Sequence, residues 1–193
     1  DGKRGTEGSG IMRITISGPP GSGKTTACAR LSEVLGYRAE VFGRVFREMA
    51  ARKGVSVSEL GMMAEKDPSI DSEIDSIILE VARENDDIIL ESRLSAYLTK
   101  MNGIDAFRVY MHASPDVRMR RICVREDEEF DRTCAQTIER EESEARRYMM
   151  YYGIDTTDLS VYDLIIDTDK ISPGEVVDTI IGAINERYAC ERP

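Results

Sequence analysis

The sequence predicts an α/β domain in which a parallel β-sheet is covered by helices on both faces. Short apolar β segments alternate with helical segments along the chain, which is the order that a parallel sheet requires. A glycine-rich phosphate-binding pattern lies between the first strand and the first helix. With 193 residues, the chain can bury one sizeable core, so we expect a single domain.

The first expected element is a strand over 12–17, followed by a helix over 23–35 that ends at Gly36. Apolar runs predict further strands over 87–92, 106–113 and 162–168. Helical spacing predicts the remaining helices over 44–53, 58–66, 71–84, 115–125, 133–151 and 173–188. The segment 38–85 carries more helix than one crossover connection needs, and we interpret it as a helical insert.

The composition argues against several classes of protein. Apolar residues make up 41% and charged residues 32% of the chain, as in ordinary globular proteins. The net charge of −10 argues against a broad basic surface for DNA or RNA. We expect no membrane span and no signal segment. The four cysteines lack metal-ligand spacing, which favours reduced thiols in a cytoplasmic protein.

Residues 1–11 are polar and rich in glycine. This composition predicts a disordered leader or a cloning remnant. We therefore expect the single folded domain to span 12–193.

The segment GPPGSGKT, Gly18–Thr25, fits the pattern G-x-x-x-x-G-K-[ST] in full. Its glycines let backbone N–H groups turn toward an anion, and the N-terminus of the next helix adds partial positive charge. Lys24 is expected to reach the β- and γ-phosphates, and the Thr25 hydroxyl to ligate Mg²⁺. A chance glycine-rich turn is the alternative, but the strand and helix on either side favour a nucleoside triphosphate site.

Other residues must decide how the triphosphate is used. A GTPase needs N-K-x-D and D-x-x-G segments, and neither occurs here; motor ATPases usually have larger chains and paired acids after a strand. The strand over 87–92 instead ends in LESR. Glu91 can hold a Mg²⁺-bound water, and Arg93 can counter a second anion. The alternative is that these two residues form a surface ion pair.

Arginines recur at helical spacing in the second half of the chain. Arg118, Arg121 and Arg125 share one helix face, and Arg140, Glu144 and Arg147 share another. Phosphoryl transfer explains such faces, because arginines and Mg²⁺ stabilise the charge of the migrating group. A phosphate acceptor is already ionised near neutral pH and needs no general base. We accordingly expect a structural role for the lone histidine, His112.

A solvated surface is the alternative for the helix that contains residues 137–151. Glu142–Arg146 and Arg140–Glu144 are i,i+4 pairs that can stabilise an exposed helix. Both interpretations hold together if the outer face is solvated and the inner face closes over an anion. In that case we expect Arg147→Ala to cost little stability and much activity, and Arg146→Ala to be nearly silent.

Several segments resemble, in order, the archaeal-type cytidylate kinases: MRITISGPPGSGKTT, IILESRLSAYL, VRMRRICVRE and TIEREESEARRYMMYYGID. The phosphate-binding segment Gly18–Thr25, called the P-loop, is common to many families. The LESRLSAYL and TIEREESEARRY segments are much more specific. The resemblance runs from about Met12 to the C-terminal helix. It implies the nucleoside monophosphate kinase fold, with a five-stranded parallel sheet, a monophosphate-binding insert over about 38–85 and a short lid over about 118–137. It also places a fifth strand near Tyr37–Val41.

The resemblance further implies roles for individual residues. The ATP phosphates would contact Gly18, Pro19, Pro20, Gly21, Ser22, Gly23, Lys24, Thr25 and Thr26. The acceptor phosphate would be held by Arg47, Arg93 and Arg147, and the acceptor ribose would lie near Arg140 and Glu144. Arg121 and Arg125 would be lid arginines, with Arg118 as a further candidate. The loop Thr168–Pro173 would lie near adenine.

Three positions depart from the family pattern. Ser92 stands where most relatives have glycine, and Phe42 replaces a small hydroxyl residue. Leu94 replaces an aspartate that reads cytosine in bacterial relatives, so the base must be recognised by other residues. Asp71 and Asp75 are candidates, because a carboxylate can accept a hydrogen bond from the cytosine amino group. For Asp71, the alternative is an acid that the helix dipole favours near a helix N-terminus.

We therefore expect an ATP-dependent kinase of CMP, with dCMP as a second acceptor and Mg²⁺ as cofactor. Closing of the lid and insert would exclude water. The alternatives are a kinase for AMP, UMP or a shikimate-like acceptor, and a P-loop regulatory ATPase. The expected partners are small nucleotides, without nucleic acid or membrane, and the protein would be a cytoplasmic monomer or homodimer.

Overall fold

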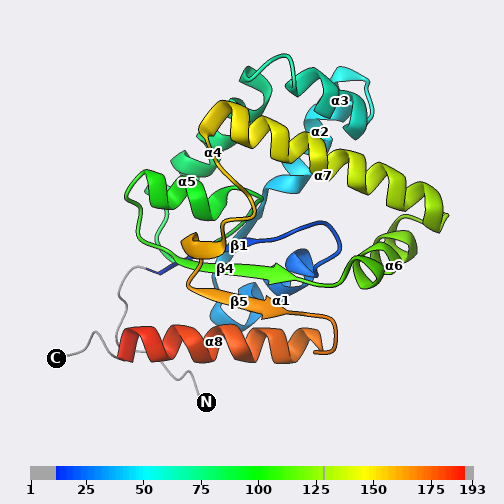
Figure 1. Ribbon diagram of the computed structural model, residues 1–193. Helices are drawn as coiled ribbons and strands as arrows, with labels where there is room; N and C mark the ends of the chain where they lie inside the picture. The colour runs from blue at the N-terminus through cyan, green and yellow to red at the C-terminus, as the bar shows by residue number, and fades with distance from the viewer. Residues whose placement is uncertain (1–11, 128, 190–193) are drawn as a thin grey trace.

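Five parallel strands form one sheet in the order β2-β3-β1-β4-β5 (Figure 1). The computed structural model describes residues 12–127 and 129–189, so the leader predicted over 1–11 lies outside the described residues. The strands are β1 Arg13–Ser17, β2 Arg38–Val41, β3 Ile88–Glu91, β4 Phe107–His112 and β5 Leu164–Asp167. The predicted α/β fold with a five-stranded parallel sheet is confirmed.

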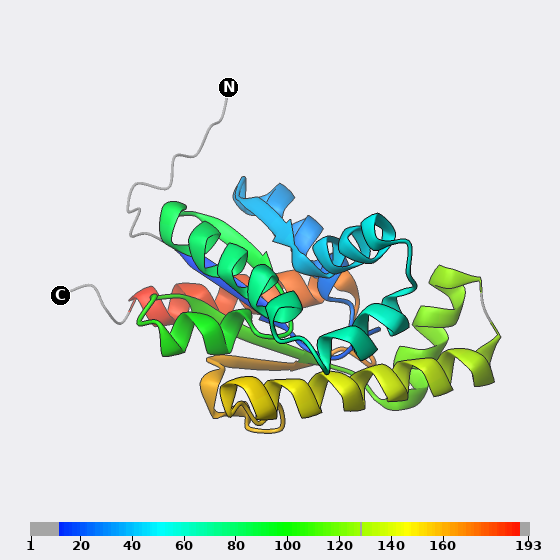
Figure 2. The same ribbon diagram turned by 90° about the horizontal axis from the view of Figure 1, so that it is seen from above.

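Helices cover both faces of the sheet and leave its carboxyl end open (Figures 1 and 2). Their bounds are α1 Lys24–Leu35, α2 Phe42–Lys53, α3 Val57–Ala64, α4 Ser69–Glu84, α5 Ser95–Met101, α6 Pro115–Glu126, α7 Phe130–Tyr152 and α8 Pro173–Ala189. A short 3-10 helix spans Leu159–Val161. Within the described ranges, no helix is both long enough and apolar enough to span a membrane.

Two hydrophobic cores lie on opposite faces of the sheet. One core joins the sheet to α1 and α8 through residues such as Ile14, Leu31 and Ile180. The other joins it to the helices α2–α5 and α7 through residues such as Leu60, Ile78 and Leu90. Residues from alternate positions of the strands enter the two cores, as expected for a sheet that is buried on both sides.

The strand order positions the site, because β1 lies between β3 and β4. In open parallel sheets, ligands bind beyond the carboxyl ends of the strands, where the order of connections reverses. The register pairs Ile16 of β1 with Glu91 of β3. The P-loop after β1 and the LESR segment after β3 are therefore neighbours. In Figure 1 the arrowheads of β4 and β5 point toward α6, at the same end of the sheet.

The pattern-based prediction lacks the 3-10 helix Leu159–Val161, the helix α5 and the strand β2. Helix α5 was missed because most of its residues are buried, so no alternation of polar and apolar residues marks it. The edge strand β2 has only the sequence RAEV and was expected through the family resemblance alone. Within the segment 38–85, β2 accounts for the first residues, and α2, α3 and α4 fill most of the remainder.

Candidate active site

The P-loop turns sharply between β1 and α1, and its glycines make the turn possible. Gly18, Gly21 and Gly23 have φ angles of 144°, 78° and 90°, in a region that residues with a Cβ rarely adopt. A Cβ on Gly18 would clash with the carbonyl oxygen of Met111. A Cβ on Gly21 would lie 2.5 Å from the carbonyl oxygen of Arg118. The loop is thus packed against β4 and the first turn of α6.

Lys24 begins α1 and is buried beneath the loop. Its Nζ atom donates a hydrogen bond to the carbonyl oxygen of Pro19 at 2.7 Å. Burial, assisted by the charge of Arg93, lowers the pKa of Lys24 to about 7. An anion in the loop would therefore stabilise the charged form of this lysine strongly.

Thr25 and Glu91 meet at the carboxyl end of the sheet. The Thr25 hydroxyl donates to Oε2 of Glu91 at 2.9 Å. Glu91 is 5% exposed and forms no ion pair with Arg93, so the alternative of a surface pair between these two residues is wrong. Arg93 turns instead toward α7 and the P-loop, where Nη1 donates to the carbonyl oxygen of Gly18 at 2.5 Å.

Glu144 on α7 holds two arginines at once. Its Oε2 accepts from Nε of Arg93 at 2.7 Å, and its Oε1 accepts from Nε of Arg140 at 2.9 Å. Burial raises the pKa of Glu144, but the charges of Arg93 and Arg140 outweigh burial and hold the pKa at about 2. Glu144 is therefore ionised throughout the physiological range and keeps both guanidinium groups beside the P-loop.

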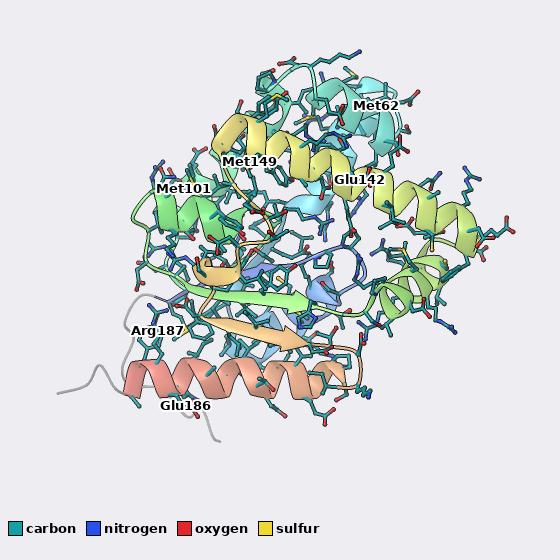
Figure 3. All side chains as sticks on the ribbon, in the orientation of Figure 1. Met62, Met101, Glu142, Met149, Glu186 and Arg187 are labelled. Carbon is teal, nitrogen blue, oxygen red and sulfur yellow. The ribbon has the colours of Figure 1, made fainter. Side chains whose placement is uncertain are left out.

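Arg147 lies on the inner face of α7, and its neighbour Arg146 lies on the outer face. Arg147 donates to both carboxylate oxygens of Asp71, with Nε–Oδ2 and Nη2–Oδ1 distances of 2.7 and 3.4 Å. The Arg147 side chain is 4% exposed and that of Arg146 is 57% exposed. Arg146 pairs with Glu65 and Glu142, and Glu142 marks the solvated side of α7 in Figure 3.

The partner of Arg147 corrects one sequence-based expectation. Asp71 does not only complement a helix N-terminus; it forms a buried ion pair that joins α4 to α7. Removing one member of such a pair leaves the other charged and buried, which costs about 3–5 kcal/mol. The pair, which the sequence did not reveal, argues against the expectation that Arg147→Ala would change stability only modestly.

The arginines of α6 have different environments. Arg121 donates to the Oγ1 and carbonyl oxygen of Thr168 at 3.0 and 2.7 Å, and to the carbonyl oxygen of Gly21 at 3.3 Å. It thereby joins the loop after β5 to the P-loop. Arg125 is exposed and pairs with Glu126. Both arginines line the cavity.

Arg118 does not belong to the lining of that cavity. It is 8% exposed and donates to Oε1 of Glu141 at 2.6 Å and to the carbonyl oxygen of Pro20 at 3.1 Å. Arg118 thus supports the P-loop from outside the cavity, and the structure does not favour it as a third lid arginine facing the ligand. His112, at the end of β4, is likewise absent from the lining.

One cavity of about 860 Å³ connects these groups. Its cationic lining residues are Lys24, Arg47, Arg93, Arg121, Arg125, Arg140 and Arg147, and its acidic ones are Asp71, Asp75, Glu91, Glu126 and Glu144. Burial and the nearby charges of Arg125 and Arg140 lower the pKa of Arg47. Positive charge therefore gathers in the cavity although the chain has a net charge of −10.

Helices α4 and α7 also contribute acidic, aromatic and apolar side chains to the cavity. Asp75 on α4 accepts a hydrogen bond from the Tyr152 hydroxyl on α7, at an Oη–Oδ2 distance of 2.5 Å. Burial raises the pKa of Asp75 to about 6, and the charge of Asp71 adds to the rise. Apolar and aromatic side chains, including Ile74 and Tyr148, line the walls nearby.

Two tyrosines and two long-range contacts of the site were not found from the sequence. Tyr148 and Tyr152 follow Glu144 at successive four-residue steps on α7, so helical spacing could have indicated them. The Arg147–Asp71 pair and the Thr168 contact with Arg121 join segments far apart in the chain. No local pattern in the sequence reveals such pairs.

Solved structures of small kinases have the same fold. A shikimate kinase from Bacteroides thetaiotaomicron superimposes with a TM-score of 0.61 at 17% identity, covering 93% of this chain and 99% of that one. A gluconokinase from Sinorhizobium meliloti gives a TM-score of 0.63 at 13% identity, covering 95% and 98%.

Curated relatives are much more similar in sequence. A cytidylate kinase from Sulfurisphaera tokodaii is 43% identical over 174 residues, which cover 90% of this chain and 96% of the relative. A cytidylate kinase from Halobacterium salinarum is 40% identical over 181 residues, which cover 94% and 93%. The sequence model described as the cytidylate kinase-like family matches residues 13–170. This chain belongs to the cytidylate kinase-like family.

Proposed function

We propose that this chain transfers the γ-phosphoryl group of ATP to CMP, giving ADP and CDP, and that dCMP is a second acceptor. One observation carries the proposal: the P-loop and a separate arginine cluster line the same cavity, which suits two phosphorylated ligands. The arginine cluster consists of Arg47, Arg93, Arg140 and Arg147. The relatives called cytidylate kinase, whose lengths this chain covers almost in full, direct the choice of acceptor to CMP.

The ATP phosphates are assigned to the loop Gly18–Thr26, with Lys24 reaching the β- and γ-phosphates. The Thr25 hydroxyl and the Glu91 carboxylate lie 2.9 Å apart, and both are the oxygen donors that Mg²⁺ prefers. Thr25 would hold the ion directly and Glu91 would hold it through water. Bound Mg²⁺ supplies neutralisation of the charge on the β- and γ-phosphates.

The acceptor phosphate is assigned to Arg47, Arg93 and Arg147. Guanidinium groups suit this role because they form charge-assisted and often bidentate hydrogen bonds to phosphate. Arg140 and Glu144 are assigned to the region of the acceptor ribose. The contact of Arg93 with Gly18 of the P-loop supports a role for this arginine toward both the acceptor and the migrating group.

In the reaction, an oxygen of the acceptor phosphate attacks the γ-phosphorus of ATP. The bond to the bridging oxygen breaks, and its electron pair leaves with ADP. Lys24, Arg93, Arg121 and Arg125 stabilise the charge on the migrating group. No general base is needed, because the second pKa of a phosphate is about 6. Closure of the lid over about 118–137 and of the helical insert would exclude water.

Measuring acceptor-dependent ADP release tests this function. CMP, dCMP, UMP, AMP and shikimate are compared at equal ATP concentration, and we expect CMP to give the highest kcat/KM. Lys24→Ala should lower kcat at least about 100-fold while the protein stays folded, because charge stabilisation in the transition state is lost. ATP hydrolysis that no acceptor accelerates would indicate a regulatory ATPase and contradict the proposal.

A further inference from the structure

We propose that Asp75 selects the base of the acceptor, by accepting a hydrogen bond from the exocyclic amino group of cytosine on its Oδ1 atom. The inference rests on the proposed function and adds the residue that distinguishes CMP from UMP. Asp75 lies on α4 and lines the same cavity as the arginine cluster of the acceptor site.

The Asp75 carboxylate is oriented by one contact and keeps one oxygen for a ligand. The Tyr152 hydroxyl donates to Oδ2 at 2.5 Å, which ties this oxygen to α7. Among the described residues, Asp75 takes part in no ion pair with an arginine or lysine. The Oδ1 atom is thus available in the cavity.

The neighbouring acid cannot serve in the same way. Both oxygens of Asp71 accept hydrogen bonds from Arg147, so Asp71 is committed to a residue of the proposed phosphate site. Asp75 follows Asp71 by one helical turn, which is a displacement of about 6 Å along α4. The two helices therefore carry two successive contacts, Arg147–Asp71 and Tyr152–Asp75. The proposal places the acceptor phosphate at the first contact and its base at the second.

The surroundings of Asp75 suit a flat base. Ile74, Leu94 and Tyr148 line the cavity with it, and apolar or aromatic walls are typical of sites that hold a ring. Leu94 is 1% exposed and contributes no polar atom from its side chain. Asp75 supplies the carboxylate among these neighbours that can discriminate between the pyrimidines.

The chemistry separates the two pyrimidines at a single group. Cytosine presents an amino donor where uracil presents a carbonyl acceptor. An ionised carboxylate accepts a hydrogen bond from the amino group but meets the carbonyl as a second acceptor, which leaves both groups unsatisfied. An unmatched buried polar pair is disfavoured strongly enough to give at least about a tenfold preference for CMP.

Protonation should reverse the hydrogen-bonding character of Asp75. Burial, opposed by the Tyr152 hydrogen bond and augmented by Asp71, brings its pKa to about 6, and the charge of Arg147 also acts on it. Above pH 6, Oδ1 accepts from cytosine; below pH 6, a proton on Oδ1 can be donated to the uracil carbonyl. The ratio of kcat/KM for CMP to that for UMP should therefore fall as the pH falls from 8 to 5.

The ratio removes effects that both substrates share. The acceptor phosphate also titrates near pH 6, but its titration affects CMP and UMP alike and cancels in the ratio. The measurement needs only the unmodified protein. A ratio that stays constant between pH 8 and 5 would overturn the assignment of Asp75.

A matched pair of substitutions on α4 gives a second test. In Asp75→Asn, the amide carbonyl can still accept from Tyr152, so the amide nitrogen faces the base as a donor. The CMP-to-UMP ratio of kcat/KM should fall at least about tenfold. Asp71→Asn should lower kcat/KM for both substrates together, because it weakens the support of Arg147. Glu73→Gln, at an exposed position of the same helix, should change neither value.

The outcomes separate this inference from the proposed function. If the unmodified protein does not phosphorylate CMP, the proposed function fails. If it phosphorylates CMP and Asp75→Asn leaves the CMP-to-UMP ratio unchanged, or lowers both values equally, the inference about Asp75 is wrong while the proposed function stands.

Discussion

At the scale of single residues, acids hold the arginines in place before any ligand arrives. Two unit charges 4 Å apart repel each other by about 4 kcal/mol at an effective dielectric constant of 20. The cavity brings many cations together, and Glu144 and Asp71 offset that repulsion by binding Arg93, Arg140 and Arg147. The donors are thereby oriented in advance, which is the condition for strong electrostatic stabilisation of a transition state.

Arg147→Lys tests the inner face of α7 without leaving Asp71 unpaired. Lysine keeps the charge but cannot form the bidentate contact, so kcat/KM for CMP should fall at least about tenfold while the KM for ATP changes little. Arg146→Lys is the matched control on the outer face and should be nearly silent. Steady-state kinetics for both variants provide the measurement, and equal small effects at the two positions would contradict a role of Arg147 in the acceptor site.

Asp75→Asn should stabilise the ligand-free protein at pH 8. The pKa of Asp75 is raised from 3.8 to about 6 in the folded state, so folding favours the protonated acid, and that contribution is lost as the pH rises through about 6. Removing the charge should therefore increase the free energy of unfolding by up to about 3 kcal/mol at pH 8. Urea unfolding between pH 8 and 4 measures the gain, which should shrink as the pH falls from 6 toward 3.8. A gain that does not depend on pH would contradict this titration.

At the scale of elements, the P-loop depends on the first turn of α6 as well as on its own strand and helix. Arg118 contributes its backbone to the close approach at Gly21 and its side chain to the carbonyl oxygen of Pro20. Arg121 reaches the carbonyl oxygen of Gly21. A movement of α6 is therefore transmitted directly to the loop assigned to the ATP phosphates.

Gly21→Ala and Gly36→Ala separate steric contact from backbone strain. Both glycines have positive φ, but a Cβ on Gly21 meets the backbone of Arg118 at 2.5 Å, whereas one on Gly36 meets nothing within 4 Å. Both substitutions should cost about 1 kcal/mol of stability or more, yet only Gly21→Ala should weaken ATP binding, by at least about tenfold. Isothermal titration calorimetry with ATP checks this prediction, and an equal loss of affinity in the two variants would contradict it.

At the scale of the whole molecule, one cavity joins elements from the entire chain. The P-loop, the helical insert, the end of β3, the hairpin of α6 and α7, and the loop after β5 all contribute to its lining. The sheet provides the fixed part, because its strands are buried on both sides. The insert and the hairpin lie at the open carboxyl end of the strands (Figure 2).

Two nucleotides should bind together and stabilise the fold. A nonhydrolysable ATP analogue with Mg²⁺ should raise Tm, and adding CMP should raise it further, because each ligand binds the folded state at its own part of the cavity. Differential scanning fluorimetry measures both shifts. A combined shift no larger than that given by the tighter-binding ligand alone would show that the two ligands compete for one site.

The order of strands and helices could be predicted from local patterns because periodicity reports how each segment is buried. The largely buried α5 lacks such periodicity, and the short edge strand β2 is too brief to show it. At the site, spacing alone indicated the arginine face of α7. It did not indicate that Asp71 would be the partner of Arg147, because no local pattern connects residues of α4 and α7.

The P-loop could be predicted from local sequence, since glycines at fixed spacing between a strand and a helix permit only a small set of backbone conformations. The residues of α7 that share a face could be predicted as well, because the helical repeat is regular. What those faces meet depends on tertiary packing: Glu144 lies between two arginines, Arg147 contacts Asp71, Arg118 lies outside the cavity, and Tyr152 contacts Asp75. These pairings depend on the packing of helices distant in sequence, and burial together with the neighbouring charges then shifts the pKa of each buried acid.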